Sequence, residues 1–222
     1  MNRTITLDAA DGHRFGAYLA EPAAAPRGAL VVVQEIFGVN AHIRSVADGY
    51  AADGYLAIAP ALFDRVERGI ELGYAEADIQ RGVGLKAATG NDRPLLDIAA
   101  AIAQVAHAGK VGIVGYCWGG LLSWLAACGL DGLSASVPYY GGGMPEHASL
   151  TPRCPVLAHF GERDSHIPLS AVADFRAAQS GITMELYPAL HGFNCDQRAS
   201  HDAASAALAR ERTVAFLRRH IG

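Results

Sequence analysis

The sequence has few charged residues, and it lacks any long apolar run. Charged residues make up 18% of the 222 residues, and the formal net charge is −4. Nucleic-acid binding needs clustered lysines and arginines on one face, so this weak acidity predicts that nucleic acid is not a partner. No segment approaches the roughly 20 consecutive apolar residues of a membrane span. Residues 1–7 lack the apolar core of a secretory signal, and we therefore expect a cytoplasmic protein.

Cysteine is also scarce, which excludes a disulfide scaffold. The chain has four cysteines, Cys117, Cys128, Cys154 and Cys195. None forms a C-x-x-C pair and the histidines show no metal-ligand spacing, so the sequence predicts no metal. The glycines around Cys117 match neither G-x-G-x-x-G nor a phosphate-binding loop, which predicts no nucleotide cofactor. We expect no cofactor at all and free thiols.

What the sequence does contain is apolar residues, which make up 51% of the chain. This share is too large for a disordered protein and is enough to bury a sizeable core. No repeat, low-complexity run or Ser/Pro/Gly-rich linker interrupts the chain. The sequence therefore predicts a single domain over residues 1–222.

Apolar runs of strand length alternate with helical patterns along this domain. The predicted strands are Thr4–Asp8, Arg14–Ala20, Ala29–Val33, Leu56–Ala59, Val111–Val114, Leu133–Tyr139, Val156–Phe160 and Thr183–Tyr187. The predicted helices are 40–54, Pro94–Ala106, a helix from Trp118, Ala171–Gln179 and a C-terminal helix through Leu217; residues 61–92 are the least periodic and predict short helices. The first two strands form a β-hairpin. The pattern predicts an α/β fold, with a mostly parallel central sheet and helices on both faces.

One segment, Gly115-Tyr116-Cys117-Trp118-Gly119-Gly120, follows a buried strand and opens a helix. It has the G-x-nucleophile-x-G form of a nucleophile elbow, with cysteine in place of serine. The sharp turn needs small residues two positions on either side, and the helix N-terminus stabilises a thiolate. The alternative is a buried structural cysteine in a glycine-rich turn.

Two later residues complete a triad in the chain order nucleophile, acid, base. Asp164 follows the strand Val156–Phe160, and His191 follows the strand Thr183–Tyr187. Both therefore lie at the carboxyl ends of strands, where open α/β sheets bind ligands. Glu162 is a rival acid, Asp164 alternatively caps a helix or forms a turn, and His191 alternatively is a solvated loop histidine. The correct order of all three favours catalysis.

The loop after the strand Ala29–Val33 carries Glu35 and Ile36. In this fold that loop supplies one amide of the oxyanion hole, which we expect to consist of the backbone N–H groups of Ile36 and Trp118. Glu35 beside a thiol nucleophile can hold or take the thiol proton. The alternative is a surface loop acid.

These segments resemble the dienelactone hydrolase family (carboxymethylenebutenolidase), an α/β-hydrolase family. The resemblance covers nearly the whole chain through residues 34–40, 115–120, 161–164, 191–193 and 204–213. It implies a triad of Cys117, His191 and Asp164, with Glu35 contacting the resting thiol until substrate binding moves it. It also implies thiolate attack on a lactone or ester, a thioacyl-enzyme and hydrolysis with His191 as base, with dienelactone converted to maleylacetate.

The resemblance leaves the substrate side open. The prototype enzymes hold the substrate carboxylate with two arginines, one of them four residues after the histidine, where this chain has Cys195. We name Arg81 and Arg198 as candidates for this role, with solvated loop arginines as the alternative, and Tyr140 as a pocket-lining candidate that is equally suited to the edge of the core. The expected partner is a small, anionic ester or lactone, and the expected state is a monomer or weak dimer.

Two rival functions stay open. One is a cysteine hydrolase of other small esters or thioesters, which the missing arginine favours. The other is a non-catalytic or redox-sensing protein on the same fold, in which Cys117 is an oxidisable thiol. Such a sensor often has a resolving cysteine nearby, and the sequence does not place Cys154 or Cys195 relative to Cys117.

Overall fold

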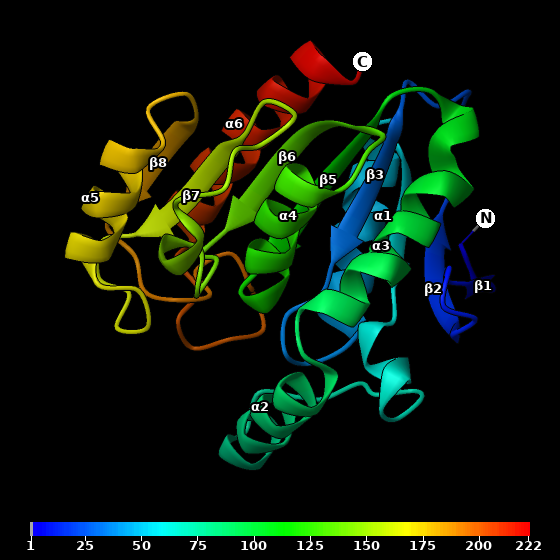
Figure 1. Cartoon of the computed structure of the whole chain (residues 1–222), viewed down its shortest axis with the longest axis horizontal. Helices are drawn as coiled ribbons and strands as arrows, with labels where there is room; N and C mark the ends of the chain where they lie inside the picture. Colours follow the sequence, from blue (N-terminus) through cyan, green and yellow to red (C-terminus); the bar gives the residue numbers. More distant parts are fainter. Residues whose placement is uncertain (1) are drawn as a thin grey trace.

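A computed structural model describes residues 2–222, and its strands form one eight-stranded sheet (Figure 1). The strands are β1 (Arg3–Asp8), β2 (Arg14–Ala20), β3 (Ala29–Val33), β4 (Leu56–Pro60), β5 (Val111–Tyr116), β6 (Leu133–Tyr139), β7 (Leu157–Gly161) and β8 (Thr183–Tyr187). Their order is β1-β2-β4-β3-β5-β6-β7-β8. The hairpin β1–β2 and the pair β2–β4 are antiparallel, and all other neighbours are parallel. The predicted hairpin and mostly parallel sheet are confirmed.

Helices connect the strands and cover the sheet. The α-helices are α1 (Ala41–Ala52), α2 (Glu76–Thr89), α3 (Asp92–Val105), α4 (Trp118–Gly129), α5 (Leu169–Ala178) and α6 (Ala203–His220), and the short 3-10 helices are η1 (Leu62–Arg65), η2 (Ala106–Ala108) and η3 (Pro145–His147). Among the described residues, no helix combines the length and the apolar character needed to cross a bilayer.

Strand β3 shows why a continuous apolar run becomes a central strand. All five of its residues are buried. Leu30 and Val32 pack in one apolar cluster together with residues of α1, whereas Val31 and Val33 pack in a second cluster together with residues of α3. Since successive side chains of a strand point to opposite faces, both faces of β3 lie under helices.

Helix α2 corrects the expectation of only short helices in residues 61–92, because it is 14 residues long. Its buried residues are few, namely Gly82, Leu85 and Thr89. Ile79 and Val83 instead line a cavity, so the helix lacks the apolar stripe of a core helix. Figure 1 shows α2 beyond the carboxyl ends of the parallel strands, where the site lies.

Candidate active site

Cys117 occupies a strained turn between β5 and α4. Its φ of 56° and ψ of −117° place a non-glycine residue at positive φ, a rare conformation that concentrates at functional sites. A Cβ on Gly115 would lie 1.9 Å from the carbonyl oxygen of Gly119, and a Cβ on Gly119 would lie 2.4 Å from that of Val33. Only glycine fits at both positions, which is the steric requirement of a nucleophile elbow.

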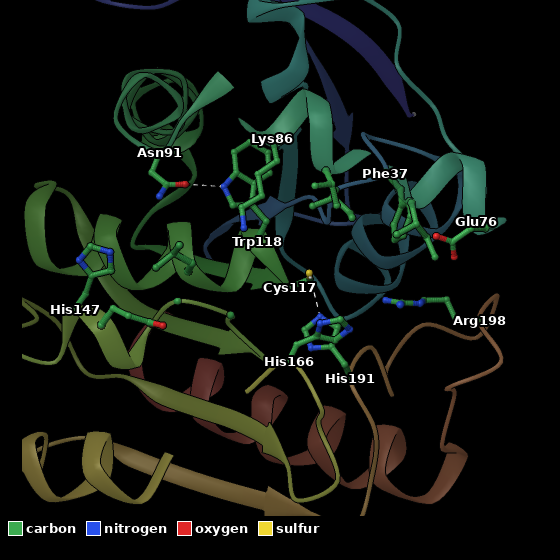
Figure 2. Close-up of a pocket in the computed structure, with 17 residues that line it drawn as sticks. Phe37, Glu76, Lys86, Asn91, Cys117, Trp118, His147, His166, His191 and Arg198 are labelled. Atoms are coloured by element: carbon green, nitrogen blue, oxygen red, sulfur yellow. Dashed lines mark hydrogen bonds between the residues drawn. The ribbon is translucent and has the colours of Figure 1, made fainter. Parts of the chain in front are cut away.

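Three side chains form one hydrogen-bonded line at this edge of the sheet. The Cys117 Sγ lies 3.1 Å from His191 Nε2 (Figure 2), and His191 Nδ1 lies 2.7 Å from Asp164 Oδ2. The backbone N–H of His166 donates to the other carboxylate oxygen of Asp164 at 2.8 Å. Glu162, the rival acid, is exposed to solvent. The parallel strands thus bring together residues 74 positions apart in the sequence.

The protonation of His191 is set by this line. Burial opposes the charged imidazole, but the Cys117 sulfur and the hydrogen-bonded Asp164 carboxylate outweigh it and raise the pKa of His191 to about 10. An imidazolium in this position donates from Nδ1 to Asp164 and from Nε2 to the sulfur of Cys117. Such a donor stabilises a thiolate.

Two backbone amides in the wall of the cavity that contains Cys117 lack a hydrogen-bond partner among the described residues. Ile36 and Trp118 both line the cavity that contains Cys117. Within residues 2–222, neither backbone N–H donates a hydrogen bond to a protein acceptor. The Trp118 ring is held separately, because its Nε1–H donates to Asn91 Oδ1 at 2.9 Å (Figure 2).

Helix α2 lies directly against the loop that carries Ile36. A Cβ on Gly82 would lie 2.2 Å from the carbonyl oxygen of Ile36. The helix can approach the loop this closely only because residue 82 is glycine. Gly82 therefore determines how near α2 sits to one of the two free amides.

Glu35 is buried, but it contacts Arg198 instead of the Cys117 thiol that the resemblance implies. Its carboxylate Oε1 accepts from Arg198 at 3.4 Å, and within the described residues it makes no hydrogen bond with Cys117. The Arg198 guanidinium also lies over the rings of Phe37, at 5.5 Å, and Tyr74, at 6.0 Å. In this structure the sulfur of Cys117 faces His191 rather than Glu35.

The sulfur opens into a cavity of about 800 Å³. Apolar side chains, among them Phe37, Ile79 and Leu121, form much of the wall. Two cations, Lys86 and Arg198, also line it and approach Cys117 from different directions (Figure 2). The cavity can therefore hold an apolar group beside an anionic one.

The structure brings only part of the predicted substrate-binding set to this cavity. Arg198 lines it, whereas Arg81 is half exposed and pairs with Glu67 at 2.6 Å. Tyr140 is fully buried, with its ring 5.1 Å from that of His191, so it packs behind the imidazole rather than in the cavity wall. Sequence reasoning missed Lys86.

A signal for Lys86 was present in the sequence. The residues of α2 that line the cavity are Glu76, Ile79, Val83 and Lys86, whose spacing of three and four places them on one helical face. The apolar pattern of this face is weak, because only Ile79 and Val83 are apolar and Glu76 and Lys86 at its two ends are charged. Without the cavity position, it does not differ from a solvated surface.

A cysteine on a nucleophile elbow, followed along the chain by an aspartate and a histidine at the ends of later strands, defines an enzyme of the α/β-hydrolase class. The family model for the dienelactone hydrolase family matches residues 15–221. The chain therefore belongs to the dienelactone hydrolase family, and it is a carboxymethylenebutenolidase-like hydrolase.

Individual relatives agree with this assignment. The chain is 34% identical to carboxymethylenebutenolidase of Pseudomonas putida over 224 residues, which covers 96% of this chain and 94% of that protein. It is similar to a crystal structure from Klebsiella pneumoniae subsp. pneumoniae MGH 78578, with 31% identity, a TM-score of 0.85 and coverage of 99% and 100% of the two chains. A dienelactone hydrolase-like promiscuous phosphotriesterase from metagenomic libraries shares the fold, with 21% identity, a TM-score of 0.76 and coverage of 100% of this chain and 99% of its own.

Proposed function

We propose that this protein hydrolyses small esters or lactones by nucleophilic catalysis at Cys117. The observation that carries the proposal is the hydrogen-bonded line from Cys117 through His191 to Asp164, beside two free backbone amides. A thiolate, a proton carrier and oxyanion donors are the groups that acyl transfer needs.

In the first half of the reaction, the Cys117 thiolate attacks the carbonyl carbon of the substrate. The carbonyl oxygen becomes an oxyanion, which accepts hydrogen bonds from the amides of Ile36 and Trp118. The intermediate then collapses: the C=O double bond forms again, the single bond between the acyl carbon and the leaving oxygen breaks, and the leaving oxygen takes the proton of His191 Nε2. For a lactone this step opens the ring, so the leaving group stays attached to the acyl chain.

In the second half, His191 acts as a base. Its neutral Nε2 takes a proton from a water molecule, whose oxygen attacks the thioester carbon. The bond to the sulfur breaks, which releases the carboxylic acid and regenerates the thiolate–imidazolium pair. Asp164 holds the ring orientation throughout and stabilises its charged form.

Glu35 is a candidate catalytic residue whose position controls the charge beside the sulfur. Paired with Arg198, as here, its carboxylate is partly neutralised, and the thiolate is not exposed to a free neighbouring charge. A move of Glu35 toward Cys117 would place a second negative charge beside the sulfur, which disfavours the thiolate and favours the resting thiol. This proposal makes Arg198 the group that keeps Glu35 away from the sulfur.

For the substrate, we propose an anionic ester or lactone, with dienelactone and its product maleylacetate as the first candidates. Lys86 and Arg198 supply positive charge to the cavity wall, and a substrate carboxylate would bind beside one of them. The cavity volume of about 800 Å³ supports a second candidate, esters or thioesters larger than a simple lactone, because sites of roughly 300–1,000 Å³ hold drug-sized ligands.

The redox-sensing alternative has less support. Burial raises the pKa of Cys128, Cys154 and Cys195 to about 11 in each case. A resolving cysteine must be a thiolate to form a disulfide with an oxidised partner. At neutral pH these three thiols stay protonated, so they are poor resolving groups for Cys117.

Several expectations stay predictions. These are a single domain, a cytoplasmic location, a monomeric or weakly dimeric state, and turnover without a cofactor.

The test is a kinetic comparison on a panel that contains dienelactone, neutral activated esters and a thioester. Wild type, Cys117→Ala and the matched buried-thiol control Cys154→Ala are measured on each substrate. We expect loss of turnover in Cys117→Ala alone. Full activity of Cys117→Ala would refute the proposal, and the ranking of substrates decides between dienelactone and the wider ester class.

A further inference from the structure

Three metal-ligating side chains meet in the interior close to the candidate active site. Glu35 comes from the loop after β3, His42 from the start of α1, and Cys195 from the loop after β8. A carboxylate oxygen, a ring nitrogen and the sulfur all lie within 4.8 Å of one another. All three residues are buried, and none lines the cavity that contains Cys117.

Two polar atoms of this cluster have no partner. Within the described residues, Glu35 Oε2 and His42 Nε2 are buried and make no hydrogen bond. Buried carboxylate oxygens and ring nitrogens are nearly always paired with protein or water. Their coincidence in one cluster, both without a partner, indicates a missing ligand rather than two independent defects.

The surroundings of His42 prepare its free nitrogen for a cation. His42 Nδ1 lies 3.2 Å from a carboxylate oxygen of Asp196. Because the carboxylate accepts, Nδ1 is the donor of this pair, which leaves Nε2 as the ring nitrogen that can bind a cation. Histidines that bind metals commonly donate the other ring N–H to a carboxylate in this way.

The donor set and its charge fit one kind of cation. A carboxylate, a thiolate and a neutral imidazole carry a charge of −2; Arg198, 3.4 Å from the Glu35 carboxylate, offsets part of it, and the remaining negative charge favours a divalent ion. Oxygen, nitrogen and sulfur together are the ligands of Zn²⁺ and its borderline-soft neighbours rather than of Mg²⁺ or Ca²⁺. Tetrahedral bonds of about 2.0–2.3 Å put donors roughly 3.3–3.8 Å apart. From separations of up to 4.8 Å, the cluster would therefore contract by at most about 1.0–1.5 Å.

The cluster also has an entry side. A small second cavity of about 200 Å³ is lined by His42 and Asp196, together with Arg210 and Asn194. Asp196 is largely exposed, so this cavity connects the His42 ring with solvent. This cavity shares no lining residue with the cavity that contains Cys117.

We propose that Glu35, His42 and Cys195 form a binding site for a borderline-soft divalent cation, with Asp196 orienting His42. On binding, the Cys195 thiol gives its proton to solvent and its sulfur bonds to the ion, with no change of oxidation state. The fourth position of a tetrahedral ion is left for water. Because Glu35 is a ligand, a bound ion holds its carboxylate in place.

The test uses Zn²⁺ and Co²⁺ as probes in a Cys117→Ala background. This background removes the thiol of the candidate active site, so the outcome does not depend on the proposed hydrolysis. Chelator-stripped protein is titrated with Zn²⁺ in competition with a chromophoric chelator. We expect one bound equivalent, and a loss of at least about a hundredfold in affinity on adding His42→Gln or Cys195→Ala.

Cys154→Ala is the matched control, because Cys154 is also a buried free thiol outside the cluster. We expect it to bind Zn²⁺ as the background protein does. Co²⁺ should give a thiolate-to-metal charge-transfer band that Cys195→Ala lacks, and circular dichroism checks that each variant is folded.

Two results would overturn the proposal. One is the absence of stoichiometric Zn²⁺ binding in the Cys117→Ala protein itself, which needs no cluster variant to be folded. The other is binding that persists unchanged in both His42→Gln and Cys195→Ala.

Discussion

Replacing Gly82 by alanine tests how the packing of α2 controls the oxyanion loop. The new Cβ would lie 2.2 Å from the carbonyl oxygen of Ile36, whereas ordinary contacts begin at 3.4 Å. Helix and loop must therefore separate by about 1.2 Å. Overpacking of this kind costs about 1–3 kcal/mol, and the better helix propensity of alanine offsets about 1 kcal/mol of it.

The larger effect should be on catalysis. The displaced carbonyl belongs to Ile36, whose own N–H lies in the adjoining peptide group and is the one that we assign to the oxyanion hole, and a 1 Å misplacement can cost about a hundredfold in rate. We expect Gly82→Ala to lower kcat/KM by roughly tenfold to a hundredfold, while the free energy of unfolding falls by about 0–2 kcal/mol. The assay pairs hydrolysis of an activated ester with urea unfolding.

Gly84→Ala is the matched control within the same helix, because a Cβ there meets nothing within 4 Å. We expect it to leave kcat/KM unchanged and to raise stability by up to about 1 kcal/mol. If Gly82→Ala behaved like Gly84→Ala in both assays, the packing of α2 against Ile36 would have no role in the site.

Three further predictions concern Asp164, His159 and Lys86. Asp164→Asn should lower kcat by about 10²–10⁴-fold with the fold intact, because His191 loses the carboxylate that stabilises its charge; an unchanged kcat would remove Asp164 from the triad. His159 is fully buried, and burial, aided by Arg212, lowers its pKa to about 3. The contribution of neutral His159 to stability is therefore complete above pH 6.5. As the pH falls from 6.5 toward 3, this residue should lower the free energy of unfolding by about 1.4 kcal/mol per pH unit. Urea unfolding should show a smaller pH dependence in His159→Gln than in wild type. Lys86→Met should raise KM for an anionic ester but not for a neutral one, and equal changes for both would show that Lys86 does not bind a substrate anion.

The sequence predicts the elbow and the order of the triad because both depend on local rules. Gly115 is required by the turn itself, because a Cβ there would meet the carbonyl oxygen of Gly119; Gly119 is required by the close approach of the turn to β3. Asp164 and His191 follow two buried strands, and the carboxyl ends of parallel strands meet at one edge. Neither inference needs the position of a distant side chain.

The details that the sequence misses all depend on packing between distant segments. Arg81 and Lys86 lie five positions apart on the same helix, yet only Lys86 lines the cavity. Which of them does so depends on how α2 is rotated against the loop after β3, and this rotation has no local signature.

The buried cluster of Glu35, His42 and Cys195 also depends on packing between distant segments. Glu35 and His42 are seven positions apart with no ligand spacing of a known motif, and Cys195 is distant in the sequence. The spacing of the histidines predicts no metal, whereas the fold brings these three residues within 4.8 Å. A site assembled from two loops and the start of a helix becomes visible only when these segments are placed.

The most direct test of the central assignment is to identify the acylated residue. Wild-type protein is mixed with an activated acetate ester, quenched within the first turnover and digested for mass spectrometry. The account predicts an acetyl adduct on the peptide that carries Cys117, and none in Cys117→Ala. Hydrolysis without an adduct on that peptide, or an adduct on a different residue, would contradict it.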